Sequence, residues 1–155
     1  MVFIDTMSVV EPTIDNFLQV MHNYQKEHNI TTMSCVNSMF LRDSVKRGFP
    51  TARVVPVFCI SGQRTLVHLV VKIHGEILEP SYDIASLHDK VYVETVNDMR
   101  KRNCSPADID IRKFLEFTEL AAQINLLKMP CNSADVQYYE ALADYCNKAF
   151  AAASK

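Results

Sequence analysis

The stretch that decides the fold is residues 34–83, which read SCVNSMFLRDSVKRGFPTARVVPVFCISGQRTLVHLVVKIHGEILEPSYD. Apolar residues recur near one face of residues 35–47, so this segment is a predicted helix, and Gly48 is a natural stop for it. Runs rich in β-branched residues follow, separated by short turns. They predict three strands, at residues 52–60, 66–73 and 76–82.

Three local features sharpen this prediction. Ser34 or Thr32 is placed to cap the helix. Its polar side carries charged residues that we expect to be solvated, namely Arg42, Asp43, Lys46 and Arg47. Pro56 cannot donate a ladder hydrogen bond, so its strand is expected to lie at a sheet edge or to contain a bulge.

The second and third strands form a hairpin whose register can be predicted. His74 and Gly75 make a two-residue turn with glycine second, so Ile73 pairs with Glu76. The same register puts His68 opposite Ser81. Side chains two positions apart share a face, so the acids on the His68 face are Glu79, its diagonal neighbour, and Asp83.

The rest of the chain adds helices and one more strand. Ile14, Phe17, Leu18 and Met21 have helical spacing and predict a helix over residues 12–28. Further segments are a strand at 90–96, a helix from Ser105-Pro106 to about residue 128, and a last helix starting at Ser133 with Asp135. Helices, antiparallel strands and helices in this order predict one α+β domain over residues 1–155.

Composition narrows the class of protein. With 48% hydrophobic residues and a net charge of −2, the chain is typical of a globular domain and lacks the basic footprint of a nucleic-acid binder. No apolar run approaches the roughly 20 residues that span a bilayer, and the N-terminus is a poor signal peptide. The five cysteines are widely spaced without a CxxC, which favours a reducing, intracellular (cytoplasmic) location over disulfides or zinc.

Cys35 is the candidate nucleophile. A helix N-terminus stabilises a thiolate through its dipole and free amides, and the same amides can stabilise an oxyanion. The alternative is a buried structural cysteine, which is the commoner fate of an unpaired thiol.

His68 and Glu79 are the candidate base and its partner. A carboxylate beside a histidine fixes the imidazole tautomer and stabilises imidazolium. The alternative is an ordinary surface ion pair on an exposed sheet face. Asp83 stays open as the acid in place of Glu79. We assign no chemistry to His22, His28, His74 or His88, the first two of which are expected on the polar side of the first helix.

The order of these residues resembles the transglutaminase-like cysteine hydrolase superfamily, within the papain-like fold. The resemblance covers about a third of the chain: Cys35 at a helix start, Gly48 to Val55 (GFPTARVV), His68 on a strand, and Glu79-Pro80-Ser81 after it. It implies a triad of Cys35, His68 and Glu79. The chain departs from the family in having glutamate where aspartate is usual, Val70 where tryptophan is common, and Thr51 inserted after Pro50.

An upstream polar side chain often completes the oxyanion hole of papain-like enzymes, and the upstream residues here are Gln25 and Asn29. We interpret Asn29 as the terminator of the first helix instead.

Three functional hypotheses follow. The first is a thiol hydrolase or acyltransferase acting on an amide or peptide bond of a protein or peptide substrate, without a cofactor, metal, nucleic acid or membrane. The second is a catalytically inactive transglutaminase-like domain that serves as a protein-binding module, as the glutamate and the missing tryptophan suggest. The third is an α+β interaction domain unrelated to that fold.

Overall fold

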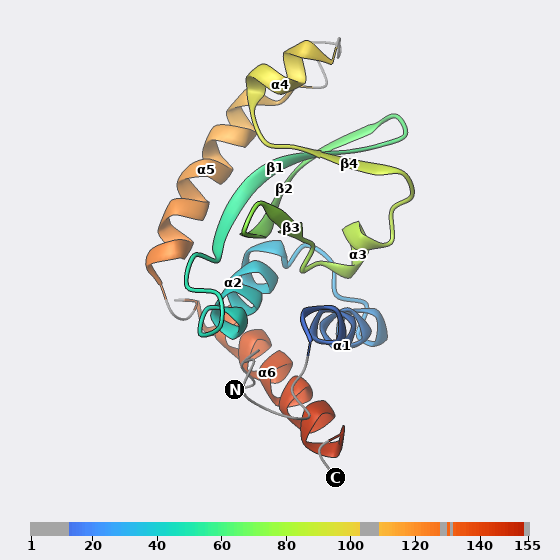
Figure 1. The fold of residues 1–155 in the computed structure, drawn as a ribbon, viewed down its shortest axis with the longest axis vertical. Helices are drawn as coiled ribbons and strands as arrows, with labels where there is room; N and C mark the ends of the chain where they lie inside the picture. The colour runs from blue at the N-terminus through green and yellow to red at the C-terminus, as the bar shows by residue number, and fades with distance from the viewer. Residues whose placement is uncertain (1–12, 103–108, 128–129, 131, 154–155) are drawn as a thin grey trace.

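A computed structural model describes residues 13–102, 109–127, 130 and 132–153. The order of elements confirms a mixed helix and strand architecture with one antiparallel sheet (Figure 1). The helices are α1 (Ile14–Glu27), α2 (Ser34–Val45), α3 (Tyr82–Ala85), α4 (Val96–Lys101), α5 (Ile111–Leu126) and α6 (Ser133–Ala153). The strands are β1 (Arg53–Ser61), β2 (Arg64–Ile73), β3 (Glu76–Leu78) and β4 (Lys90–Val93).

The four strands are ordered β3-β2-β1-β4. The predicted hairpin register is confirmed, because Ile73 pairs with Glu76 and both turn residues, His74 and Gly75, have positive φ. The third strand is shorter than predicted and ends at Leu78. The chain then turns into α3, which the sequence reading missed.

Pro56 lies in β1, which is an interior strand and not the predicted edge strand. It pairs with Leu69 of β2 on one side. On the other side β4 pairs with β1 only from Phe58 onward, so the position of Pro56 has no described strand neighbour there. The missing N–H of Pro56 is tolerated because no described strand pairs with β1 at that position on the β4 side.

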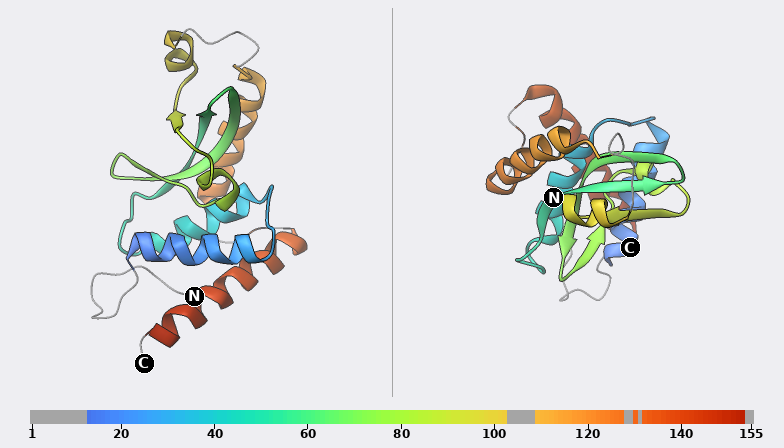
Figure 2. Two further views of the ribbon diagram at one scale, coloured as in Figure 1. Left: turned by 90° about the vertical axis from the view of Figure 1, so that its right-hand side faces the viewer. Right: turned by 90° about the horizontal axis from the view of Figure 1, so that it is seen from above.

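Helices cover the sheet unevenly. In Figures 1 and 2, α5 runs along one face of the sheet, while α2, α1 and α6 stack at one end of the molecule. The main buried cluster joins α1, α2, α5 and α6 to β1, β2 and β3, with Phe17, Phe40, Leu69 and Leu142 among its residues. A smaller cluster, with Phe58 stacked on Phe114, lies between the sheet and α5. The predicted inward face of α1 is confirmed by burial of Phe17 and Met21.

Two predictions about α2 are wrong. Neither Ser34 nor Thr32 caps it, since the N-cap is Met33 and no side chain bonds the first turn. Arg42 is only 2% exposed instead of solvated. Its guanidinium donates to the backbone carbonyls of Ile124 and Leu127 and pairs with Asp43 at 2.6 Å, so the C-terminus of α5 compensates the buried charge.

The later helices also differ from the prediction in places. The predicted start at Ser105-Pro106 lies outside the described residues. The described helix, α5, begins at Ile111, where Asp110 accepts a hydrogen bond from the Lys113 amide. The strand predicted at 90–96 ends at Val93, and Val96 begins α4, a helix that the sequence did not predict. The last helix begins at Ser133 as predicted.

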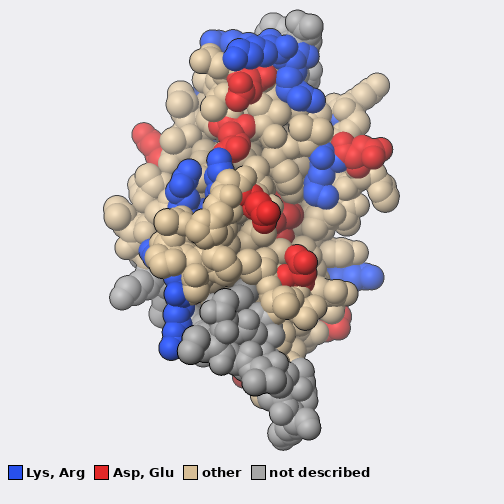
Figure 3. Space-filling view, in the orientation of Figure 1, with Lys and Arg blue, Asp and Glu red and all other residues tan. Residues whose placement is uncertain are grey.

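The surface in Figure 3 carries both signs of charge, with basic side chains gathered at the end of the molecule that includes α4. No helix among the described residues is long and apolar enough to cross a membrane.

Candidate functional site

His68 and Glu79 meet across the hairpin. His68 donates from Nε2 to the Glu79 carboxylate Oε2 at 2.7 Å. Both residues are buried, with 4% and 9% of their surface exposed, so the pair is not the surface ion pair considered above. The bond engages Nε2 of the imidazole, so Nδ1 is the ring nitrogen that a substrate or a thiol would use.

Glu79 accepts further hydrogen bonds that hold its carboxylate in place. The Tyr92 hydroxyl on β4 donates to Oε1 at 2.7 Å, and the Ser81 amide donates to Oε2 at 3.1 Å. Burial, and then the Glu79 charge, raises the pKa of Tyr92 well above its usual range, so the hydroxyl remains a donor. A carboxylate with three donors is fixed in orientation.

A second cysteine lies near this carboxylate. Cys59 is opposite Tyr92 in the ladder between β1 and β4, on the same face as His68. Burial, and then the charge of Glu79, raises the pKa of the Cys59 thiol to about 11. A thiol with this pKa stays protonated near neutral pH and is a poor nucleophile.

The segment that carries Glu79 is clamped by helix α1. Gln25, which is 1% exposed, donates from Nε2 to the Pro80 carbonyl at 2.7 Å and accepts from the Tyr82 amide at 2.7 Å. His22 donates from Nε2 to the Glu79 carbonyl at 2.7 Å. Two side chains one helical turn apart therefore bond three residues of one loop, which fixes the position of the acid.

Asn37 extends the clamp to α2 and α6. Its amide donates to the Ser81 hydroxyl at 3.1 Å and to Gln25 Oε1 at 3.4 Å, and its carbonyl accepts from the Tyr138 hydroxyl. Asn37 is 1% exposed, so these bonds satisfy an amide that would be costly to bury alone.

Asp83 does not take the role of Glu79. The third strand ends before it, so the alternation that would have put Asp83 on the His68 face stops at Leu78. Asp83 lies in the first turn of α3, and its backbone carbonyl accepts from Ser86. The acid in contact with His68 is Glu79.

Cys35 lies in the first turn of α2, but its surroundings are different. It lines a cavity of about 270 Å³ with Met39 from the same helix, Leu120 and Ile124 from α5, and Asp135 from α6. Burial, and then the Asp135 charge, raises the pKa of the Cys35 thiol, although the Ser34 hydroxyl acts in the opposite direction. No hydrogen bond between described residues joins Cys35 to His68.

The helix that bears Cys35 nevertheless packs beside the strand that bears His68. The Ser38 hydroxyl donates to the Leu69 carbonyl at 3.1 Å. Ser38 is three residues after Cys35 and Leu69 is one after His68, and positions three apart on a helix are about 5–6 Å apart. The backbones of the two candidate residues therefore lie in adjoining parts of α2 and β2, but the side chains of His68 and Leu69 point to opposite faces of the sheet.

Sequence reasoning missed Tyr92, His22 and the clamping role of Gln25. Gln25 follows Phe17 and Met21 at four-residue spacing, so its burial could have been read from the helical period. His22 is half-buried beside this stripe and not on the polar side, and burial lowers its pKa. Asn29 does terminate α1, with φ of 52° just after the helix ends.

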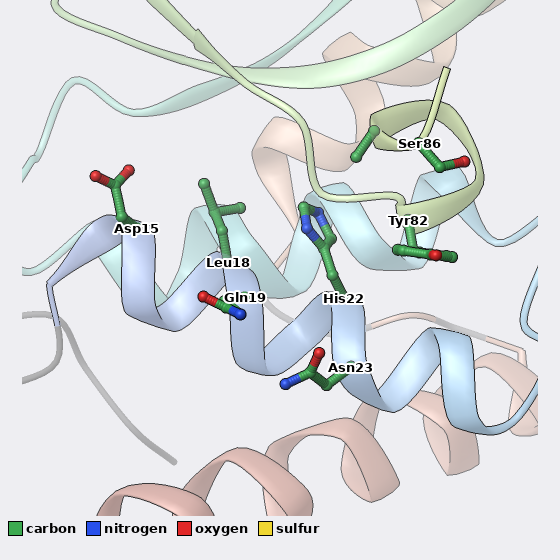
Figure 4. Close-up of a pocket in the computed structure, with 8 residues that line it drawn as sticks. Asp15, Leu18, Gln19, His22, Asn23, Tyr82 and Ser86 are labelled. Carbon is green, nitrogen blue, oxygen red and sulfur yellow. The ribbon is translucent and has the colours of Figure 1, made fainter. Parts of the chain in front are cut away.

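A groove lies on the other side of His22. It has a volume of about 430 Å³ and is lined by α1 and α3, and Figure 4 shows His22 rising from α1 between Leu18 and Tyr82. Asp15 and Gln19 lie along its α1 wall. Among the described residues, no group of three or more His, Cys, Asp or Glu side chains is arranged to hold a metal ion.

No family model matches the chain, and no curated protein or solved structure matches it. The resemblance to the transglutaminase-like superfamily therefore stays a prediction.

Proposed function

We propose that this chain is a thiol hydrolase or acyltransferase with a transglutaminase-like, papain-like core, acting on an amide bond of a protein or peptide. Cys35 is its nucleophile, His68 its general base and acid, and Glu79 the positioning residue for His68. The observation that carries the proposal is the buried His68–Glu79 hydrogen bond at 2.7 Å, with Tyr92 on the second carboxylate oxygen.

The chemistry follows from these groups. Cys35 Sγ attacks the carbonyl carbon while His68 takes the thiol proton on Nδ1. Glu79 stabilises the imidazolium, and the Cys35 backbone amide at the start of α2 donates to the oxyanion. His68 then protonates the departing amine, leaving a thioester. Water resolves this thioester in hydrolysis, and an amine resolves it in acyl transfer.

One rearrangement is required. The Cys35 thiol must turn from its cavity toward Nδ1 of His68, which lies on the adjoining strand. The cavity lies against α5, which packs on the Phe58 face of the sheet, whereas His68 lies on the opposite face. The reaction therefore requires α2 to rotate relative to β2, and a change of side-chain rotamer alone is too small. Pairing with imidazolium would then lower the pKa of a thiol that burial and Asp135 otherwise raise.

The proposal is tested by turnover. Hydroxamate formed from Nα-benzyloxycarbonyl-glutaminylglycine and hydroxylamine reports acyl transfer, ammonia from the same peptide reports deamidation, and soluble fragments of casein report proteolysis. We expect Cys35→Ala to abolish the activity and Cys59→Ala, which changes the other cysteine on the sheet, to retain it. Activity that survives Cys35→Ala and is lost in Cys59→Ala would contradict the assignment of the nucleophile.

A second candidate function is a protein-binding module built on the same core without catalysis. It is favoured by the position of Cys35 in an apolar cavity next to Asp135, where the neutral thiol is the stable form. On this reading the His68–Glu79 pair only holds the hairpin to α1. Cys35→Ala would then leave every biological effect of the chain intact.

A further inference from the structure

The size and apolar lining of the cavity beside Cys35 are explained neither by the proposed triad nor by the packing of the core. It has a volume of about 270 Å³ and lies between α2, the C-terminal half of α5 and the start of α6. Its walls are mainly apolar, with Val36 and Met39 on one side and Leu120, Ile124 and Leu127 on the other. An engineered apolar cavity of about 150 Å³ stays dry and binds benzene, so this one is large enough for a phenyl or branched aliphatic group.

Among the described residues that line the cavity, Cys35, the proposed nucleophile, is the one cysteine. With Cys35 in the position that the structure shows, an acyl group attached to Sγ has its next carbons within this apolar space, so the cavity would hold the acyl group once the thioester returns there from His68. Leu120 and Ile124 of α5, which line the cavity, are one helical turn apart and supply apolar surface, and Gln123 of the same helix adds one polar side chain.

The charge of Asp135 restricts the class of ligand that the cavity can hold. Asp135 lines the cavity and is close enough for its charge to raise the pKa of the Cys35 thiol. It would repel a carboxylate on the ligand in the same way, while it can accept a hydrogen bond from an N–H. Asn132, also at the rim, is occupied as acceptor for the Ala134 and Asp135 amides. A neutral acyl compound therefore fits better than a free acid.

We propose that this cavity is the acyl-group pocket of the site, and that the substrates are neutral amides whose acyl part has an apolar side chain of leucine or phenylalanine size. This inference rests on the proposed function. In the acylation step the C–S bond to Cys35 forms, the amide C–N bond breaks, and the thiol proton leaves on the amine through His68.

The pocket can be tested without turnover by the selectivity of thiol labelling. The full chain is treated with N-phenylmaleimide or N-methylmaleimide, and mass spectrometry of peptides follows Cys35 separately from the other four cysteines. Each rate is divided by that of glutathione. We expect the phenyl reagent to be favoured at Cys35 by about tenfold, the gain typical of filling an apolar pocket.

Matched variants on α5 locate the effect. Leu120→Trp fills the cavity, so the preference for the phenyl reagent should fall to that of glutathione. Leu115→Trp adds the same ring on the same helix at a residue that is 57% exposed and outside the cavity, and the preference should be kept. If Leu120→Trp does not fold, Asp135→Asn gives a second arm, since it should raise the rate of iodoacetate relative to iodoacetamide at Cys35.

The outcomes are separable. The pocket proposal is contradicted if wild-type Cys35 prefers the phenyl reagent no more than glutathione does. It is also contradicted if a folded Leu120→Trp chain keeps the wild-type preference. A phenyl preference that persists while His68→Ala leaves Cys35 reactivity unchanged supports the pocket and contradicts the proposed triad.

Discussion

The two sides of helix α2 face different environments. On one side, Asn37 donates hydrogen bonds to Gln25 and Ser81, and Ser38 separately donates to the Leu69 carbonyl. On the other side, Cys35 and Met39 face an apolar cavity against α5. The polar side is held by hydrogen bonds between side chains. On the cavity side, the Arg42 guanidinium ties α2 to the Ile124 and Leu127 carbonyls, and space remains between the apolar side chains.

This difference shows that His68 and Glu79 are fixed in position, whereas Cys35 has to move for the reaction. His68 and Glu79 are held in a bonded geometry by strands β2 and β4 and by helix α1. Cys35 is the member of the predicted triad whose neighbours do not bond it to the others. The polar side can thus be tested by the free energy of unfolding of variants, and the cavity side by the rate at which the Cys35 thiol is alkylated.

Glu79→Ala should have the largest effect on the polar side. It leaves the His68 ring and the Tyr92 hydroxyl without their acceptor inside the protein, and each unsatisfied buried group of this kind costs about 1–3 kcal/mol. Urea denaturation measures the free energy of unfolding. Glu76→Ala, at an exposed residue of the same hairpin, is the control and should change stability by less than about 0.5 kcal/mol. Equal effects of the two variants would show that Glu79 does not organise this side.

Gln25→Leu comes next. The leucine retains the volume of the side chain but leaves the Pro80 carbonyl and the Tyr82 amide unsatisfied, at a cost of about 1–3 kcal/mol for such groups. Thermal and urea unfolding should both record the loss. Gln19→Leu, on the open side of the same helix, should be near neutral. A neutral Gln25→Leu would mean that α1 does not clamp the loop.

Tyr92→Phe removes one donor to Glu79 and should cost about 1 kcal/mol. Tyr145→Phe is the matched control, since its hydroxyl contacts Glu27 at 3.5 Å on the exposed surface. The difference between the two variants in urea unfolding sharpens the claim that the carboxylate is fixed from β4. No difference would assign that role to His68 and the Ser81 amide alone.

The smallest expected effect is that of His22 on the pH dependence of stability. Burial lowers the pKa of His22 in the folded chain below the value of about 6.5 for a free histidine. As pH falls below this value, the unfolded chain binds the proton more readily than the folded one, so stability decreases toward acid pH. His22→Gln should remove this contribution, and His28→Gln, at an exposed histidine, should not. Unfolding curves between about pH 7 and pH 5 measure it.

The sequence predicted the polar side better than the cavity side, for a physical reason. The contact of His68 with Glu79 depends on a local turn at His74-Gly75, whose residue preferences set the register. The surroundings of Cys35 depend on α5 and α6, which are far away in the sequence. No local pattern at residues 34–45 specifies which helices will cover that face.

Arg42 is a similar case. Its charge predicted exposure, yet carbonyls at the end of α5 satisfy it in the interior. Gln25 could have been recognised from the four-residue spacing of the buried face of α1, while its partners at Pro80 and Tyr82 could not, because they come from a distant loop.

The most direct test of the proposed triad is the rate of Cys35 alkylation by iodoacetamide as a function of pH, in the wild-type chain and in His68→Ala. Burial and Asp135 raise the pKa of this thiol more than the Ser34 hydroxyl lowers it, so a pKa below that of a free thiol that disappears in His68→Ala is assigned to pairing with His68. We predict that wild-type Cys35 reacts as a thiolate well below pH 8.5, the approximate pKa of a free cysteine, and that His68→Ala removes this reactivity. A Cys35 that reacts no faster than a free thiol, with the same profile in both proteins, would contradict the account.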